Sequence, residues 1–291
     1  MFFGSLKNWI KHLLKKYFYI IKVWDKFTPS VQIEQRRLFL YYQEMGKSNN
    51  VPAIKDTGYR VFSQHEEDGL LLFVFGIIGM HHKTFVEIGS NDGVNSNCAN
   101  FAINFGWHGL FIDGDKLSIQ RGKYFYNKYP DPWSYPPKFV CARITAENID
   151  DVISKAGFSG NVDLLSIDID GNDYWIWNAI KAIDPRVVII ETHVEFGYNN
   201  IVVPYDPHYF FPGKHRVYHG ASPVAMNNLA KRKGYKLVGA NNYGFNLIFV
   251  KNELGGVLLP EVTVESILQH PSAIESFKLY EDVKNWEYLP G

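Results

Sequence analysis

A glycine-rich turn follows a short apolar stretch in the segment VEIGSNDG, residues 86–93. The pattern E-x-G-x-x-x-G between a strand and a helix carries few side chains, so backbone N–H groups and the positive end of the helix dipole can approach an anionic ligand. A dinucleotide fingerprint would need glycine at positions 91 and 94, where the chain has Asn91 and Val94. The turn therefore favours the carboxylate and amine of a methionine moiety over a pyrophosphate. Its candidate cofactor-binding residues are Glu87, Gly89, Asn91 and Gly93.

A second candidate is Asp113, which comes 20 positions after Gly93 at the end of the next apolar stretch. An acidic side chain at this place can accept hydrogen bonds from both ribose hydroxyls and so distinguishes a free ribose from a 2′-phosphorylated one. Asp115 competes for this role, and its alternative is to cap the start of a helix. The spacing and the glycine-rich turn together predict a nucleoside site.

Carboxylates also gather at the ends of two further apolar stretches, in SIDIDGND (166–173) and in IIETH (189–193). Ligands of open α/β sheets bind outside the carboxyl ends of the strands. We therefore expect these side chains to meet beside the reacting group. The residues concerned are Asp168, Asp170, Glu191 and His193.

Packed carboxylates repel one another unless a proton, a cation or a base separates them. One solution is a hard divalent cation such as Mg²⁺ held by Asp168, Asp170 and Glu191, which would also polarise an acceptor hydroxyl. Another solution leaves Asp170, His193 or Asp168 as a metal-free general base. In a purely structural alternative, Asp173 caps a helix and Asp168 accepts backbone N–H groups.

These residues lie on a regular alternation of strands and helices from about residue 60 to 250. Short apolar stretches rich in β-branched residues predict buried parallel strands, and a capping-box pattern at 63–66 predicts a helix over the apolar run 70–78. The predicted strands cover 84–88, 109–112, 138–142, 162–167, 187–190, 236–239 and 246–250, and further helices cover 96–105 and 223–233. The pattern is typical of a Rossmann-like α/β domain.

Two extensions flank this domain, so the predicted division of the chain is 1–55, 56–252 and 253–291. Residues 5–24 place apolar side chains at helical spacing with lysines between them, which predicts a helix that packs on the domain or on a partner. The alternative is a helix that lies on an anionic membrane surface. A second helix is predicted over 31–45 and a polar linker over 46–56, whereas the tail is assigned no role.

The segment 195–221 is long, aperiodic and rich in tyrosine, phenylalanine and histidine. Loops of this length without secondary structure are usually functional or disordered, and the aromatic content speaks against disorder. We expect a lid that binds the acceptor, and the alternative is a cover over the sheet edge. The histidines have no spacing that supports a tetrahedral zinc site.

The composition of the 291 residues, 46% hydrophobic and 21% charged, is that of a folded globular protein and excludes a disordered one. The formal net charge of zero gives no overall field that would attract nucleic acid. Two cysteines, Cys98 and Cys141, cannot form a disulfide framework, which predicts a cytoplasmic protein. No stretch reaches the roughly 20 apolar residues of a membrane span. The oligomeric state stays open.

Seven blocks between about residues 60 and 252 resemble those of FkbM-type and related class I S-adenosylmethionine-dependent methyltransferases. The blocks are FSQHEEDG, FVEIGSNDGVNSN, GWHGLFIDGD, VDLLSIDIDGNDYWIW, VVIIETH, GASPVAMNNLAKRKGYKLVG and GFNLIFV. The resemblance implies a mostly parallel seven-stranded sheet with helices on both faces, preceded by N-terminal helices, and S-adenosylmethionine (SAM) as the cofactor. Many members of this family are encoded with polysaccharide or natural-product pathways.

Carried over by position, the resemblance implies a cofactor loop, a ribose-binding acid and two carboxylates beside the methyl group. It also matches a recurrent segment ahead of the first strand, with a role in cofactor contact. The residues are Glu87, Gly89 and Gly93 for the loop, Asp113 for the ribose, Asp168 and Asp170 beside the methyl, and Gln64 and Asp68 in the segment. The chain departs from the family in reading DIDG at 168–171 where typical members read D-x-E-G, and it lacks the loop lysine of catechol-type metal enzymes.

These features predict a SAM-dependent enzyme that methylates an oxygen of a sugar or glycan-related small acceptor, in surface polysaccharide or natural-product biosynthesis. A NAD-type Rossmann oxidoreductase is one alternative, and Asn91 argues against it. A non-catalytic nucleoside-binding or scaffolding protein is the other. A scaffold would have no use for Glu87, Asp113 and the gathered carboxylates together.

Overall fold

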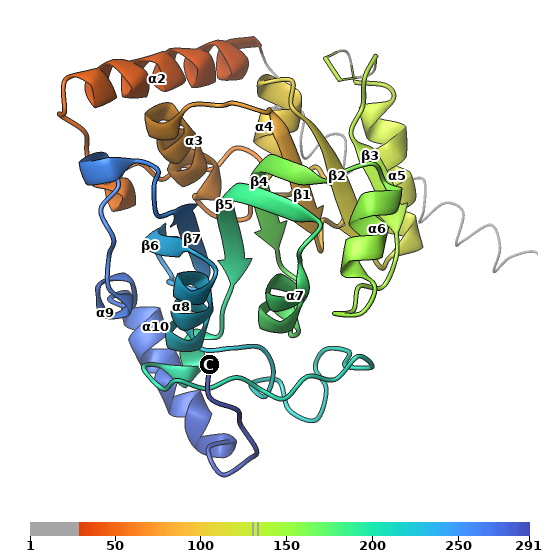
Figure 1. The fold of residues 1–291 in the computed structure, drawn as a ribbon, viewed down its shortest axis with the longest axis vertical. Helices are drawn as coiled ribbons and strands as arrows, with labels where there is room; N and C mark the ends of the chain where they lie inside the picture. The colour runs from red at the N-terminus through yellow and green to blue at the C-terminus, as the bar shows by residue number, and fades with distance from the viewer. Residues whose placement is uncertain (1–28, 130, 133) are drawn as a thin grey trace, which may run out of the picture.

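A seven-stranded sheet forms the centre of the computed structural model, which describes residues 29–129, 131–132 and 134–291 (Figure 1). The strands are β1 (Thr84–Ile88), β2 (His108–Asp113), β3 (Lys138–Cys141), β4 (Gly160–Ile167), β5 (Ile183–Glu191), β6 (Tyr235–Ala240) and β7 (Asn246–Lys251). Their order is β3-β2-β1-β4-β5-β7-β6. The strands β1 to β5 pair in parallel, whereas β7 runs antiparallel between β5 and β6.

The central strands are buried on both faces, which explains their continuous apolar sequences. The chain runs outward from β1 to β2 and β3, then returns to place β4 on the other side of β1. The strand order therefore reverses between β1 and β4. In open α/β sheets, this switch point is where a crevice for ligands opens at the carboxyl ends of the strands.

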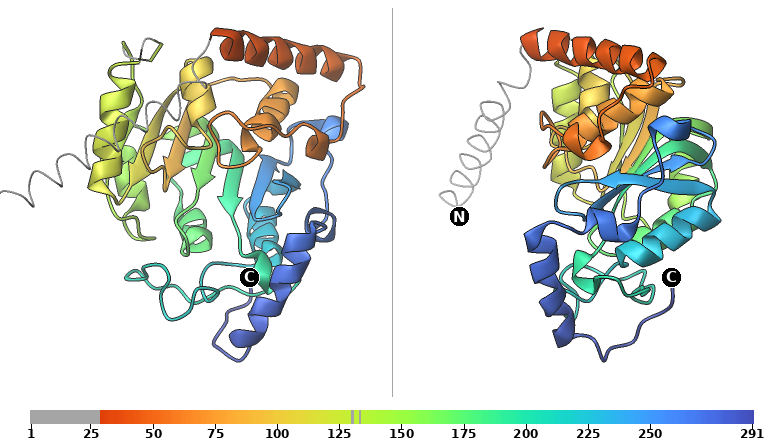
Figure 2. Two further views of the ribbon diagram at one scale, coloured as in Figure 1. Left: turned by 180° about the vertical axis from the view of Figure 1, so that it is seen from behind. Right: turned by 90° about the vertical axis from the view of Figure 1, so that its left-hand side faces the viewer.

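Helices cover both faces of the sheet (Figure 2). One face packs against α6 (Ile149–Lys155), α7 (Asp173–Ala179) and α8 (Pro223–Arg232), and the other against α2 (Pro29–Lys47), α3 (Glu67–Ile78), α4 (Ala99–Asn104) and α5 (Lys116–Tyr126). Side chains alternate between the two cores along each strand, as Phe85 and Val86 do in β1. The predicted Rossmann-like, mostly parallel seven-stranded fold is confirmed.

Two helix starts differ from the sequence prediction. The capping box expected at 63–66 does not form, because the Ser63 hydroxyl accepts the N–H of Asp68 rather than that of Glu66, and the Ser63 N–H donates to the Asp68 carboxylate rather than to Glu66. The helix expected from residue 96 begins only at Ala99, because the buried carboxylate of Glu87 binds the N–H groups of residues 97 and 98. In both places a buried carboxylate, that of Asp68 or of Glu87, accepts N–H groups just before the helix.

The segment predicted as a lid is irregular from residue 197 to 221 and follows the short 3₁₀ helix η3 (Val194–Phe196). In Figure 1 it passes below the carboxyl ends of the strands, next to the C-terminal elements. The C-terminal elements are η4 (Gly256–Leu258), α9 (Val264–Ile267), α10 (Pro271–Ser276) and η5 (Phe277–Asp282); α10 and η5 contact η3 at the start of the lid, whereas η4 lies near the end of α2. Leu289 pairs through its backbone with Val202, so the tail supports the base of the lid.

The N-terminal region contributes α2, which is longer than the predicted 31–45, and the linker contains the 3₁₀ helix η2 (Ile54–Asp56). The amphipathic helix predicted over residues 5–24 lies outside the described residues. Among the described residues, no helix combines the length and the hydrophobicity that a membrane crossing requires.

Candidate active site

A cavity of about 820 Å³ opens at the carboxyl ends of the parallel strands, where the topology predicts a ligand crevice. It is bounded on one side by the glycine-rich turn after β1 and by the ends of β2 and β3. On the other side lie the ends of β4 and β5, and the lid, residues 197–221, closes part of the mouth. The cavity thus brings together sequence-predicted residues of both kinds, those assigned to the cofactor and those assigned to the reaction, although Gly93 and His193 are not among its lining residues.

The turn after β1 has room for backbone only. Gly89 adopts φ +82°, and a Cβ atom added there would lie 1.6 Å from the carbonyl oxygen of Asp168. Gly93 adopts φ +69°, and its Cβ would meet the ring of Phe111 at 2.9 Å. Both positions therefore require glycine, and the turn presents main-chain atoms to the cavity.

Glu87 lines the cavity, but its carboxylate is already engaged by the protein. It accepts hydrogen bonds from the Ser96 hydroxyl at 2.8 Å and from the N–H groups of Asn97 and Cys98, each at 3.1 Å. Burial raises the pKa of Glu87, and these hydrogen bonds act in the opposite direction. Glu87 is thus an anchor that fixes the turn, and this is how it shapes the cofactor side of the cavity.

Asp113, at the end of β2, is half-buried and faces the cavity. One carboxylate oxygen accepts the N–H of Asn91 and the other accepts the N–H of Asp115, both at 2.7 Å. An ionised carboxylate offers about four acceptor positions, so each oxygen keeps one for a ligand hydroxyl. Burial raises the pKa of Asp113 and the two backbone hydrogen bonds oppose that shift.

The competing acid, Asp115, caps α5. Its side chain accepts the N–H groups of Leu117 and Ser118 and also the Ser118 hydroxyl. These bonds use the carboxylate as an N-cap does. Both acids line the cavity, but Asp113 keeps an acceptor position on each oxygen, whereas Asp115 keeps one on Oδ1 alone.

The two candidate residues in the segment before α3, Gln64 and Asp68, have different surroundings. The exposed Gln64 lines the cavity, whereas Asp68 is fully buried beneath it. Asp68 accepts the N–H groups of Val61, Phe62 and Ser63 at 2.6 to 2.8 Å. Asp68 therefore holds the turn that presents Gln64.

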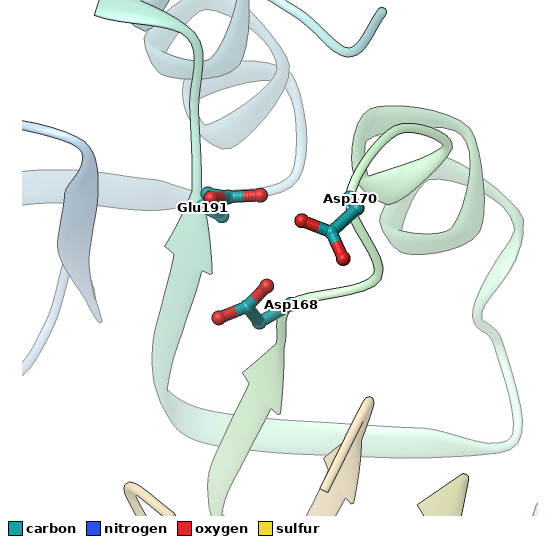
Figure 3. Close-up of side chains that lie close together, drawn as sticks. All are labelled: Asp168, Asp170 and Glu191. Carbon is teal, nitrogen blue, oxygen red and sulfur yellow. The ribbon is translucent and has the colours of Figure 1, made fainter. Parts of the chain in front are cut away.

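Asp168, Asp170 and Glu191 form the acidic cluster predicted at the ends of β4 and β5. Their oxygens lie within 4.8 Å of one another, and Figure 3 shows the three carboxylates converging from the two strand ends. Asp170 holds φ +54°, a left-handed conformation that is uncommon for a residue with a side chain. The predicted convergence of these three side chains is present in the structure.

Electrostatics in the cluster oppose full ionisation. Loss of water contact, followed by the charges of Asp173 and Asp170, raises the pKa of Asp168 to about 8. The pKa of Glu191 is raised well above its usual value by loss of water contact and then by Asp168. Within the described residues, Glu191 Oε2 has no hydrogen-bond partner. The cluster can therefore hold protons or a cation, and either would relieve the repulsion.

Asp173 has a structural role next to the cluster. Its carboxylate accepts the N–H groups of Ile169 and Gly171, each at 2.9 Å, and so fixes the turn that carries Asp170. The predicted helix cap is not formed by Asp173, because Asn172 occupies the N-cap position of α7 and its side chain makes no cap bond.

His193, predicted as a general base, lies outside the residues that line the cavity. It is buried against the rings of His219 and Phe196, and its Nδ1 lies 3.7 Å from Glu195. The strand β5 ends at Glu191, and the N–H of His193 then pairs with the carbonyl of Ala221. The chain therefore turns away after Glu191, and the alternation of a strand no longer places the residue two positions later beside the cavity.

Two further cavity residues are Arg143, which lies outside the sequence prediction of the site, and Tyr209, which belongs to the segment predicted as an acceptor-binding lid. Arg143 Nη2 donates a 2.6 Å hydrogen bond to the carbonyl of Tyr209 and so ties the lid to the loop after β3. The aromatic composition of the lid was a signal for Tyr209. No local pattern distinguishes Arg143, because its partner is 66 positions away.

No known family model matches the chain, and no curated protein matches it. Solved methyltransferase structures are similar at low identity. A Staphylococcus aureus protein, provisionally named a caffeoyl-CoA O-methyltransferase, has 17% identity and a TM-score of 0.45 over 82% of this chain and 100% of that chain. The O-methyltransferase from Bacillus cereus, in complex with S-adenosylhomocysteine (SAH), has 17% identity and a TM-score of 0.42 over 77% and 92%.

A third similar structure is the N-terminal domain of EvdMO1, solved in the presence of SAH and D-fucose. It has 10% identity and a TM-score of 0.43 over 72% of this chain and 94% of that chain. These likenesses are too distant to assign a family or a substrate, so the functional argument depends on the site itself.

Proposed function

We propose that the protein is a SAM-dependent methyltransferase that acts on an oxygen of a small acceptor. The observation that carries this proposal is the single cavity that joins a glycine turn and Asp113 on one side to an acidic cluster on the other. The turn suits the amino-acid end of SAM, because Gly89 lines the cavity and brings main-chain atoms rather than a side chain to it. Asp113 keeps acceptor capacity for the ribose hydroxyls, and the negative cluster suits a sulfonium.

When bound, SAM supplies an electrophilic methyl group. The acceptor oxygen would take this methyl group and SAM would leave as SAH, so the task left to the protein's own residues would be to accept the acceptor's proton. Asp170 is the most exposed carboxylate of the cluster and lines the cavity, so it is our candidate for that base. Alignment of the two bound reactants contributes most of the acceleration.

As the alternative to a metal-free base, a divalent cation of the Mg²⁺ type fits the same cluster. The donor set is three carboxylates, which hard cations prefer, and Glu191 Oε2 has no protein partner among the described residues. Asp168, Asp170 and Glu191 would hold the ion, which would lower the pKa of a bound acceptor hydroxyl. Dialysis against a strong chelator, followed by an assay with and without added Mg²⁺, tests this part, and turnover unaffected by the chelator contradicts it.

The acceptor that we propose is a sugar or a glycan-related molecule, within surface polysaccharide or natural-product biosynthesis. Support comes from the lid, which places aromatic rings at the mouth of the cavity, including Phe210, whose side chain is 79% exposed. Exposed rings at a cavity mouth can pack against the apolar faces of a sugar.

The proposal is tested by calorimetric titration with SAH, followed by a screen of acceptors with SAM labelled in its methyl group. We expect one SAH site per chain and label transfer to a hydroxylated acceptor. Absence of SAH binding, together with a fluorescence change on mixing with NADH, would instead support the oxidoreductase.

A further inference from the structure

The lid carries one polar side chain into the cavity that the proposed reaction does not yet use. Tyr209 lines the cavity together with Asp170 and Glu191. Its hydroxyl oxygen is buried, and no group in the described part of the chain forms a hydrogen bond with it. A buried hydroxyl without a partner is costly to a folded protein, so its presence points to a partner that arrives with a ligand.

The ring of Tyr209 is fitted between two glycines. A Cβ atom added to Gly171 would lie 2.4 Å from Cε1, and one added to Gly213 would lie 2.6 Å from Cε2, on the opposite edge of the ring. One face of the ring stacks on His219 with the centroids 5.8 Å apart. The position of the hydroxyl is therefore fixed by packing on both edges and on one face.

Hydrogen bonds also hold the backbone around Tyr209 in place. Arg143 donates to the carbonyl of Tyr209, and Asn172 Nδ2 donates to the carbonyl of Asp206 at 2.8 Å. The Tyr205 hydroxyl donates to Glu147 at 2.7 Å and accepts the N–H of Ala146 at 2.9 Å. These bonds connect the lid to the loops after β3 and β4. Tyr209 is thus held in place before any ligand binds.

The phenol of Tyr209 is a hydrogen-bond donor at neutral pH. Burial, and then the negative charges of Asp170, Asp173 and Glu191, raise its pKa above the usual range. A neutral phenol in front of an acidic cluster can donate to an oxygen that lies between the two.

We propose that Tyr209 is an acceptor-binding residue, whose O–H donates a hydrogen bond to an oxygen of the acceptor in front of the acidic cluster. This inference rests on the proposed function, because the methyl acceptor is the partner. The hydrogen bond orients the acceptor relative to Asp170, and it forms only in the complex. Removal of the hydroxyl oxygen therefore lowers kcat/KM for the acceptor. It leaves the affinity for the cofactor and the folding of the protein unchanged.

The first test needs no ligand and compares Tyr209→Phe with the lid control Tyr205→Phe by thermal unfolding. The Tyr205 hydroxyl has two protein partners, so its removal lowers Tm by about 2–4 °C. The Tyr209 hydroxyl has none among the described residues, so Tyr209→Phe leaves Tm unchanged or raises it. An equal loss of Tm in both variants would show a structural hydroxyl at position 209 and overturn the proposal.

The second test measures methyl transfer from labelled SAM to methyl glycosides of glucose, mannose, galactose and fucose. For the glycoside that the wild-type protein methylates best, we expect kcat/KM to fall about tenfold in Tyr209→Phe, with an unchanged Kd for SAH. Unchanged kcat/KM overturns the proposal. Gly171→Ala keeps the hydroxyl but displaces the ring, so it should lower kcat/KM in the wild-type protein and add nothing in a Tyr209→Ala background.

Failure of the two proposals can be told apart. If the wild-type protein does not bind SAH, the methyltransferase proposal fails. The thermal comparison, which uses neither cofactor nor acceptor, then judges the assignment of the Tyr209 hydroxyl by itself. If SAH binds and the glycosides are methylated equally well by wild type and Tyr209→Phe, only the role of Tyr209 is wrong.

Discussion

The two halves of the cavity differ in how the side chains that line them are satisfied, although Ser90 Oγ and Asp68 Oδ1, behind the first half, are also buried without a partner among the described residues. On the side of β1 and β2, the carboxylates of Glu87, Asp113 and Asp115 each accept at least two hydrogen bonds from the protein. On the side of β4, β5 and the lid, Glu191 and Tyr209 each keep a buried oxygen without a partner among the described residues. The carboxylates of the first half are therefore preorganised at little cost to stability. The unpaired oxygens of the second half lower the stability of the folded protein, but they stay available for reaction or binding.

The largest expected effect comes from Gly89→Ala, which tests whether the first half is a rigid template. The new Cβ would lie 1.6 Å from the carbonyl of Asp168 in a residue that also has positive φ, so the backbone must move. We expect a loss of about 3 kcal/mol in the free energy of unfolding, together with loss of SAH binding. Urea unfolding and calorimetry measure both.

Gly114→Ala is the matched control for this variant. Gly114 also lines the cavity, but a Cβ there meets nothing within 4 Å. Its free energy of unfolding should stay within about 0.5 kcal/mol of wild type. Similar losses in the two variants would contradict a specific requirement for glycine at position 89.

Asp113→Ala removes the two acceptor oxygens assigned to the ribose, and also the contacts to Asn91 and Asp115. We expect SAH affinity to fall by about 100-fold or more while the protein stays folded, since two hydrogen bonds to a charged group are lost. Calorimetric titration measures the affinity and circular dichroism checks the fold. An unchanged Kd would remove the main support for the nucleoside site.

Asp168→Asn tests how the acidic cluster makes the stability of the protein depend on pH. The pKa of Asp168 is raised from 3.8 to about 8 in the folded protein, so between these values the unfolded chain releases a proton that the folded protein keeps. Protonated Asp168 therefore contributes its full stabilisation of the folded protein below about pH 4, and this contribution is lost as the pH rises through 8. In chelator-treated protein, we expect Asp168→Asn to raise Tm more at pH 8 than at pH 5. A gain that is independent of pH would show that Asp168 does not titrate in this range.

Asp115→Ala has the smallest expected effect, because Asp115 serves as the N-cap of α5. The loss of a cap should lower the free energy of unfolding by about 1 kcal/mol. Asp151→Ala, at an exposed ion pair on α6, is the control and should change it by less than about 0.5 kcal/mol. A loss of SAH binding as large as that of Asp113→Ala would mean that Asp115 also contacts the ribose.

The strands could be predicted closely from the sequence, because buried parallel strands are short apolar runs with clear ends. The run predicted at 84–88 is β1 to the residue, and the remaining strands differ by a few residues at their ends. The meeting of Asp168, Asp170 and Glu191 followed from the same reasoning, since neighbouring parallel strands end at one edge of the sheet.

The lid and the tail could not be predicted in the same way, because their contacts are long-range and aperiodic. Val202 pairs with Leu289, and Arg143 reaches the carbonyl of Tyr209, with no pattern in the sequence between them. His193 does not line the cavity for a related reason. A period of two holds only within a strand, and β5 ends two residues before His193.

The contact between Gly89 and the carbonyl of Asp168 joins the two halves through the main chain. A ligand that shifts the turn after β1 also shifts the end of β4, and with it the carboxylate that holds a proton near neutral pH. If SAH binding shifts this turn, its occupancy and the proton affinity of Asp168 are thermodynamically linked, and the linkage is reciprocal. SAH titrations in buffers of different ionisation enthalpy would then report an exchange of protons with the solvent.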